Sequence, residues 1–230
     1  MTNDNETSGT VVLISGSDTA RAEVTARKWV HELAGDSPDA FSLDVIRDRD
    51  DRNTADTLGQ VVSSVLSPPF MAGRKTVWLQ NFSGFSSEGS KSSRTPDARA
   101  FHRLADVIAS GLPADVALVM NGPDVDKRKA LYRACKERGK VLLYDRPDVS
   151  KRGWEERMER LIRSRAEEKG MDLPVAVSTY LVDVIGTDTG RIEGELEKLI
   201  CYCGGLDRPV SLGAAQEVCR GEGEAISWSL

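Results

Sequence analysis

The chain has 230 residues, a length that suits one large domain or two smaller ones. Its formal net charge of −5 argues against a protein that holds DNA tightly by itself, because such proteins are usually basic. Hydrophobic residues make up 40% of the chain, yet no stretch approaches the run of about 20 apolar residues that spans a bilayer. The polar N-terminus has no apolar signal core, so we expect a cytoplasmic protein without membrane contact.

Residues 10–144 alternate between short apolar runs and segments with helical spacing. The runs with strand character are Thr10–Ser15, Phe41–Ile46, Thr76–Gln80, Val116–Met120 and Val141–Tyr144. Between them, apolar residues recur every three or four positions, as on one face of a helix. This alternation predicts a parallel sheet covered by helices, and the near-continuous apolar strands indicate a sheet buried on both faces.

The stretch Asn81–Asp97 interrupts this pattern, because it is rich in Ser and Gly and has few apolar residues. We expect a mobile surface loop there. Its two aromatic residues, Phe82 and Phe85, could pack into the core or lie exposed, and the sequence favours neither.

The strand signal ends after Pro147, and four segments with helical periodicity follow. They lie at 154–162, 180–185, 192–203 and 211–220, and glycines 204 and 205 end the third in the usual helix-stop position. We therefore predict an α/β domain over residues 1–148 and a small all-helical domain over residues 149–221.

The four cysteines are Cys135, Cys201, Cys203 and Cys219. A chain of this length builds a core without needing disulfides, and the single residue between Cys201 and Cys203 is too few for a zinc knuckle. We expect reduced, structural thiols and no metal site.

Residues 11–23, VVLISGSDTARAE, have the outline of a phosphate-binding loop. A functional loop reads G-x-x-x-x-G-K-[ST]: the glycines bring backbone N–H groups to the phosphates, the lysine reaches the terminal phosphates, and the hydroxyl binds magnesium. Counted from Gly16, the second glycine, the lysine and the hydroxyl are replaced by Arg21, Ala22 and Glu23. We therefore predict a degenerate, non-functional loop in which Glu23 would repel phosphate.

The strand ends also lack the acidic residue that an ATPase needs to bind magnesium. An ATPase of this type carries an acidic residue at the end of an apolar strand to hold magnesium. Here the third and fourth strands end in Gln80-Asn81 and Asn121-Gly122. The motifs G-x-S-x-G and H-E-x-x-H are absent too. We expect no catalytic residues and no cofactor.

The segment Leu66–Gln80, LSPPFMAGRKTVWLQ, follows a strongly patterned helix. That helix ends at Ser67-Pro68-Pro69, as proline requires. Phe70 and Met71 come next, in a turn constrained by prolines and a glycine. Large apolar residues in such a turn are either a plug into the protein's own core or an exposed anchor for a partner, and the spacing alone favours the plug.

Two stretches, Asp126–Lys140 and Lys151–Arg165, carry clustered Lys and Arg on amphipathic helices. A solvated helix face is the favoured interpretation. The alternative is a local site for a nucleic-acid backbone or an acidic partner.

Taken in order, five segments form a further pattern. They are ISGSDTARAEVTA, SPPFMAGRKTVWLQNF, ADVALVMNGPDVDKRKALYRACKERGKVLLYDRP, RIEGELEKLICYCGG and PVSLGAAQEVC. In content and spacing this pattern resembles the delta-subunit family of bacterial DNA polymerase III, over nearly all of residues 10–230.

The resemblance implies an AAA+-like fold: a RecA-like α/β domain, a helical lid, and a C-terminal helical domain that joins a pentameric collar. It implies a clamp-loader subunit of the polymerase holoenzyme that binds and opens the sliding clamp for loading onto primed DNA, without hydrolysing ATP itself. The implied partners are the sliding clamp, the other loader subunits, and primer-template DNA only within the assembled loader.

The resemblance also implies where the clamp binds. The family's clamp-binding element is a pair of adjacent large apolar residues at the end of the helix before the third strand. Those positions are Phe70 and Met71 here, with Leu66 at the helix end, so the resemblance favours the exposed anchor. Met71 departs from the Phe-Phe or Leu-Phe of many relatives, although a flexible thioether can fill an apolar pocket.

The collar domain of the family has no counterpart in this sequence. We therefore expect residues 222–230 to begin a linker to a missing C-terminal domain, through which most contacts with other subunits would run. Two other interpretations remain: an active AAA+-like ATPase with an unusual site, and an AAA+-like adaptor that acts on another partner.

Overall fold

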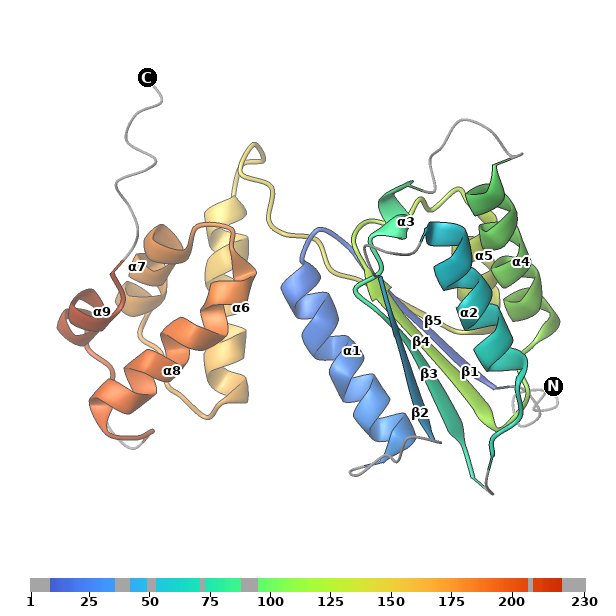
Figure 1. Ribbon diagram of the computed structural model, residues 1–230. Helices are drawn as coiled ribbons and strands as arrows, with labels where there is room; N and C mark the ends of the chain where they lie inside the picture. The colour runs from blue at the N-terminus through green and yellow to red at the C-terminus, as the bar shows by residue number, and fades with distance from the viewer. Residues whose placement is uncertain are drawn as a thin grey trace, which may run out of the picture. The chain divides into compact units, whose positions relative to one another are not determined.

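The structure is a computed structural model that describes residues 9–35, 42–48, 53–70, 73–87, 95–206 and 209–220. The chain divides into two compact units, Met1–Asp145 and Arg146–Leu230 (Figure 1). Phe41, Met71 and the expected linker at 222–230 lie outside the described residues.

Five strands form the sheet of the first unit in the order β2-β3-β4-β1-β5, and every neighbouring pair is parallel. The strands are β1 Thr10–Ser15, β2 Leu43–Arg47, β3 Lys75–Gln80, β4 Val116–Gly122 and β5 Lys140–Leu143. Val12 of the interior strand β1 pairs with Val119 on one side and with Lys140 on the other. The parallel sheet that the sequence predicts is therefore confirmed, with small shifts of the strand bounds.

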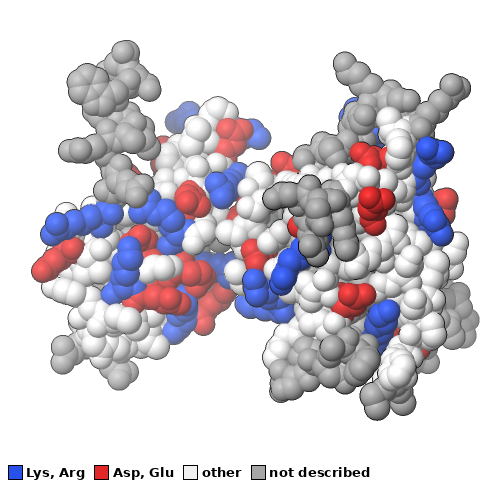
Figure 2. Space-filling view, viewed as in Figure 1, with Lys and Arg blue, Asp and Glu red and all other residues white. Residues whose placement is uncertain are grey.

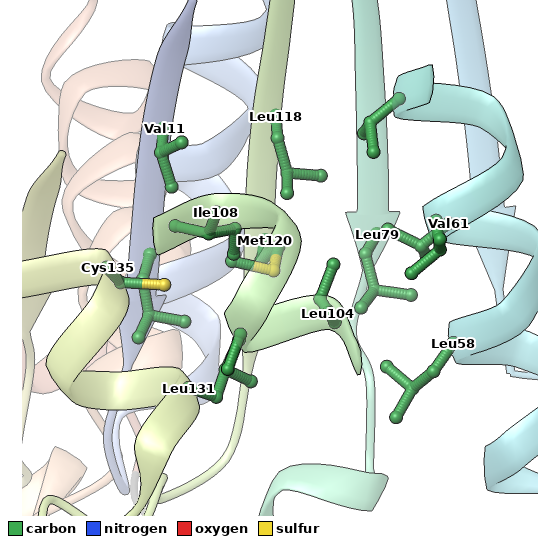
Figure 3. Close-up of a cluster of buried hydrophobic side chains, with 14 of the residues drawn as sticks. Val11, Leu58, Val61, Leu79, Leu104, Ile108, Leu118, Met120, Leu131 and Cys135 are labelled. Atoms are coloured by element: carbon green, nitrogen blue, oxygen red, sulfur yellow. The ribbon is translucent and has the colours of Figure 1, made fainter. Parts of the chain in front are cut away.

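Helices cover both faces of this sheet (Figure 1). One face packs against α1, Thr19–Ala34, through Ala22, Ala26 and Val30. The other face carries α2 Thr54–Leu66, α4 Pro96–Ser110 and α5 Ala130–Arg138. Figure 3 labels the side chains that these three helices and the sheet bury together: Val11, Leu58, Val61, Leu79, Leu104, Ile108, Leu118, Met120, Leu131 and Cys135.

The segment Asn81–Asp97 is not the continuous surface loop that its composition predicts. Phe82 and Phe85 are fully buried, and their rings meet edge to face with centroids 5.1 Å apart. The short helix α3 spans Gly84–Ser87, and α4 already begins at Pro96. The prediction was wrong at the first end because burying two large aromatic rings outweighs the loop preference of their Ser and Gly neighbours. It was wrong at the second end because the hydroxyl of Thr95 accepts from the N–H of Ala98 and Pro96 suits the first turn of a helix.

The second unit consists of helices, as the sequence predicts. They are α6 Trp154–Glu168, α7 Val175–Ile185, the 3-10 helix η1 Thr189–Arg191, α8 Ile192–Cys203 and α9 Leu212–Val218. This unit has its own apolar core, in which Met158, Ile162, Leu181, Leu196 and Leu199 are fully buried.

None of the four cysteines forms a disulfide, and they differ in exposure. Cys201 is exposed, whereas Cys135, Cys203 and Cys219 are buried. Burial raises the pKa of Cys219 to about 12, and its contacts with Glu195 act in the same direction. The thiol of Cys219 therefore stays protonated at neutral pH.

We expect Cys201 to react with iodoacetamide much faster than the other three cysteines in the folded protein, because the thiolate is the nucleophile and must be accessible. Mass spectrometry after a brief exposure should find one modified site, and all four after denaturation. Rapid native-state modification of Cys219 would contradict the packing of the second unit.

Candidate functional site

The loop at Gly16 joins the carboxyl end of β1 to α1 and packs against the chain just after β5. Gly16 has a φ of +137°, and a Cβ atom there would lie 2.0 Å from the carbonyl oxygen of Tyr144. The backbone N–H of Tyr144 donates to Ser15 at 2.9 Å, and the N–H of Asp18 donates to Tyr144 at 2.9 Å. The close approach of the protein's own backbone therefore explains why glycine is needed here, without any ligand.

The start of α1 is capped from within the chain. The carboxylate of Asp18 accepts a hydrogen bond from the backbone N–H of Arg21 at 3.0 Å, and Asp18 is buried. In a phosphate-binding loop, the positive end of the helix dipole and its open N–H groups face the phosphate. Here a carboxylate occupies that place, so a phosphate would meet a like charge.

The side chains at the three replaced positions of the phosphate-binding motif all contact other parts of the protein. The guanidinium of Arg21 lies 4.3 Å from the ring centroid of Tyr144. Ala22 is fully buried between α1 and the sheet. Glu23 accepts hydrogen bonds from Arg27 at 2.6 Å and from the side chain of Gln80 at 3.3 Å.

A cavity of about 460 Å³ lies beside this loop, at the carboxyl ends of β3 and β4. Open α/β sheets usually bind their ligands in this region. The polar side chains that line the cavity are Thr19, Glu23, Asn81, Ser83 and Asn121.

Amide side chains fill the strand ends where an ATPase would carry a carboxylate. The buried Asn121 accepts from the indole N–H of Trp78 at 2.8 Å and donates to the side chain of Asn81 at 2.5 Å. On the next strand, Gln80 accepts from the Nε of Arg47 at 2.5 Å. These contacts link the ends of β2, β3 and β4 through the neutral amides of Gln80, Asn81 and Asn121.

One carboxylate, that of Glu23, lines the cavity and pairs with Arg27. The hydrogen bond from Arg27 is the main cause that lowers the pKa of Glu23, against the opposing effect of burial. Glu23 is therefore ionised at neutral pH. Within the described part of the chain, no group of three His, Cys, Asp or Glu side chains is placed to hold a metal ion.

The opposite edge of the sheet carries the predicted binding element. There α2 ends at Leu66 and β3 begins at Lys75. Phe70 is 80% exposed and Leu66 is 54% exposed, whereas Met71 lies outside the described residues. Phe70 is thus not the core plug that the spacing alone favours.

Polar side chains that the sequence analysis missed tie the last turn of α2 to two strands. The hydroxyl of Ser64 donates to the carboxylate of Asp44 on β2 at 2.6 Å. The ammonium of Lys75 on β3 donates to the backbone carbonyl of Ser64 at 2.8 Å. A cation in the last turn of a helix is a recognisable sequence signal. Lys75 lies on β3, however, so its contact with the end of α2 is visible only in the tertiary structure.

The two basic stretches lie on α5 and α6. Arg133 and Lys136 of α5 are exposed, and Arg165 of α6 pairs with Glu168 at 2.8 Å. Figure 2 shows Lys and Arg interspersed with Asp and Glu over the visible face of the second unit. On this face the charges are mixed, which is typical of a solvated helical surface.

Residues 47–144 match the family described as DNA polymerase III, delta subunit. The matched range contains α2, the turn with Phe70 and the strands β3 and β4. The resemblance to this family is therefore confirmed over residues 47–144. No curated protein matches the chain in sequence.

Solved structures share the fold. The Bacillus subtilis DNA clamp loader delta protein (YqeN) aligns with a TM-score of 0.66 and 19% identity, over 93% of this chain and 59% of that one. This chain thus spans less than two thirds of that protein. The E. coli MS115-1 HORMA:CdnC:Trip13 complex contains a chain that aligns with a TM-score of 0.51 and 16% identity, over 91% of this chain and 73% of that one.

These likenesses agree with the AAA+-like, RecA-like architecture expected from the sequence. None of the described helices combines the length and the hydropathy that a membrane span requires.

We expect Gly16→Ala to lower the free energy of unfolding by at least about 2 kcal/mol, because it adds backbone strain and a clash with Tyr144. Urea denaturation measures this loss. The matched control is Gly59→Ala, since a Cβ at Gly59 on α2 meets nothing within 4 Å; it should stabilise the protein by about 0.5–1 kcal/mol. Equal stability of the two variants would refute the explanation given for Gly16.

Proposed function

We propose that this chain is a clamp-loader subunit of the delta type that binds and opens a sliding clamp for loading onto primed DNA. In this proposal it acts in a cytoplasmic polymerase holoenzyme and does not hydrolyse ATP itself. The observation that carries the proposal is the exposure of two large apolar side chains, Leu66 and Phe70, at the end of α2 and just after it. The match of residues 47–144 to the delta-subunit family supports it.

The end of α2 is suited to bind a partner's apolar pocket. An aromatic side chain that leaves water on binding contributes much of the free energy of a typical interface, usually as one of a few dominant residues. Pro68 and Pro69 restrict the turn before Phe70, which lowers the entropy lost on binding. We assign clamp binding to Phe70 and Met71, with Leu66 beside them.

Clamp opening follows from differential binding. A subunit that hydrolyses nothing can still shift a ring between closed and open states, provided that it binds the open state more tightly. The proposed anchor would do this by occupying one clamp interface. Nucleotide energy would then come from sister subunits, which control when the anchor reaches the clamp.

The Gly16 loop supports a role without ATP. The backbone N–H groups of Asp18 and Arg21 already donate within the protein, and Glu23 places a carboxylate in the neighbouring cavity. Because this loop and the anchor lie at opposite edges of the sheet, loss of nucleotide chemistry at one edge leaves the other unaffected.

We assign residues 1–148 to the AAA+-like domain and residues 149–221 to the helical lid. Contacts with the other loader subunits, and with primer-template DNA, are proposed for the assembled loader. They would run mainly through a C-terminal domain of the kind that the delta-subunit family carries.

The double variant Phe70→Ala with Met71→Ala should lose binding to purified sliding clamp. We expect a loss of about 30-fold or more, since a dominant interface residue contributes about 2 kcal/mol or more. Isothermal titration measures the affinity, and circular dichroism checks that the fold is intact. Val24→Ala, which truncates another exposed apolar side chain of the same unit, is the control and should bind normally.

Unchanged clamp affinity in the double variant would disprove the assigned site. Failure of the unaltered chain to capture the clamp in a pull-down would instead favour an AAA+-like adaptor with another partner.

Calorimetry with magnesium-ATP should show no tight binding and no turnover by the isolated chain. The physical reason is that the backbone N–H groups of Asp18 and Arg21 already donate within the protein, and that the adjacent carboxylates repel phosphate. Micromolar binding or measurable hydrolysis would favour the rival function, an AAA+-like ATPase with an unusual site.

A further inference from the structure

We infer that Lys75 is a positioning residue whose ammonium group holds the turn between α2 and β3, and so orients Phe70 toward its partner. The inference rests on the proposed function and adds to it a residue outside the apolar pair. It names the interaction that fixes the anchor in the free protein.

The inference rests on a hydrogen bond that joins the end of α2 to the start of β3. The Nζ of Lys75 donates to the backbone carbonyl of Ser64 at 2.8 Å, and the two residues are 11 positions apart. Phe70 lies between them. The bond therefore closes the segment that carries the anchor, and closing a segment restricts the conformations available to it.

The position of Lys75 is set by the sheet. Its backbone N–H donates to the carbonyl of Asp115 at 2.8 Å, and in the register of the sheet it lies beside Val116 of β4. The side chain is half-buried, so its stem has little freedom. The ammonium thus starts from a fixed backbone and reaches a fixed acceptor.

The acceptor is fixed as well. Ser64 is held to β2 through the 2.6 Å hydrogen bond from its hydroxyl to Asp44. Its carbonyl lies in the last turn of α2, at the negative end of the helix dipole. There it also accepts a long hydrogen bond, at 3.3 Å, from the backbone N–H of Ser67. A cation at this point stabilises the helix end and the exit direction of the chain at Ser67.

The neighbouring Arg74 provides a contrast. It carries the same charge one position earlier, is exposed, and makes no hydrogen bond or ion pair within the described residues. A general effect of positive charge near the anchor would therefore appear in both residues, whereas the positioning effect belongs to Lys75.

The test compares three variants in titrations with purified sliding clamp. Lys75→Met keeps the apolar stem and removes the donor; we expect about a tenfold loss of affinity. Lys75→Arg keeps a cationic donor and should restore affinity to within about threefold of the unaltered chain. Arg74→Met should bind like the unaltered chain. A loss in Arg74→Met equal to that in Lys75→Met would overturn the inference.

Phe70→Ala, measured in parallel, separates this inference from the proposed function. If Phe70→Ala loses binding and Lys75→Met does not, the positioning role is disproved and the clamp site stands. If Phe70→Ala binds normally, the proposed clamp site itself is wrong.

Hydrogen exchange of the free chain gives a second measurement that needs no clamp. In Lys75→Met the backbone amides of Ser67 and Phe70 should exchange faster, while those of β4 keep their protection. Unchanged exchange at both amides would overturn the inference. Should Lys75→Met fail to fold, Lys75→Leu, which also lacks a donor, provides the same comparison.

Discussion

Because all five strands are parallel, their carboxyl ends lie along one edge of the sheet and their amino ends along the opposite edge. Every strand-to-helix loop lies at one edge and every helix-to-strand turn at the other, because parallel strands are joined by crossover helices. The Gly16 loop and the cavity beside it share the first edge, and the exposed end of α2 lies at the second. Because of this separation, the residues around Gly16 can change without altering the exposed end of α2.

At the first edge, hydrogen-bonding groups around the Gly16 loop find their partners within the protein itself. Asp18 caps α1, the backbone of Tyr144 closes the Gly16 loop, and Asn121 joins Trp78 to the chain after β3. Buried polar groups that are satisfied in this way favour a single conformation. The architecture of a phosphate-binding loop is thus retained as a structural junction between β1, α1 and β5.

At the second edge, an exposed apolar side chain lies close to a network of polar contacts. Phe70 is exposed, and the hydrogen bond between Ser64 and Lys75 joins the end of α2 to the start of β3. An exposed apolar side chain gains free energy when a partner removes it from water, and it gains more where less ordering is needed on binding.

The sequence by itself determined the alternation of strands and helices, the helical second unit, and the missing lysine and hydroxyl after Gly16, because each depends on periodicity or on residue chemistry within a short segment. Only the tertiary structure decided the burial of Phe82 and Phe85, the exposure of Phe70 and the partner of Lys75. Each of these depends on residues distant in sequence, as when Phe82 contacts Phe101 of α4. The need for glycine at position 16 has the same origin, because the backbone of Tyr144 approaches it. Local spacing alone favoured a buried Phe70, since a pattern of neighbours does not reveal whether the core beneath the turn is already filled.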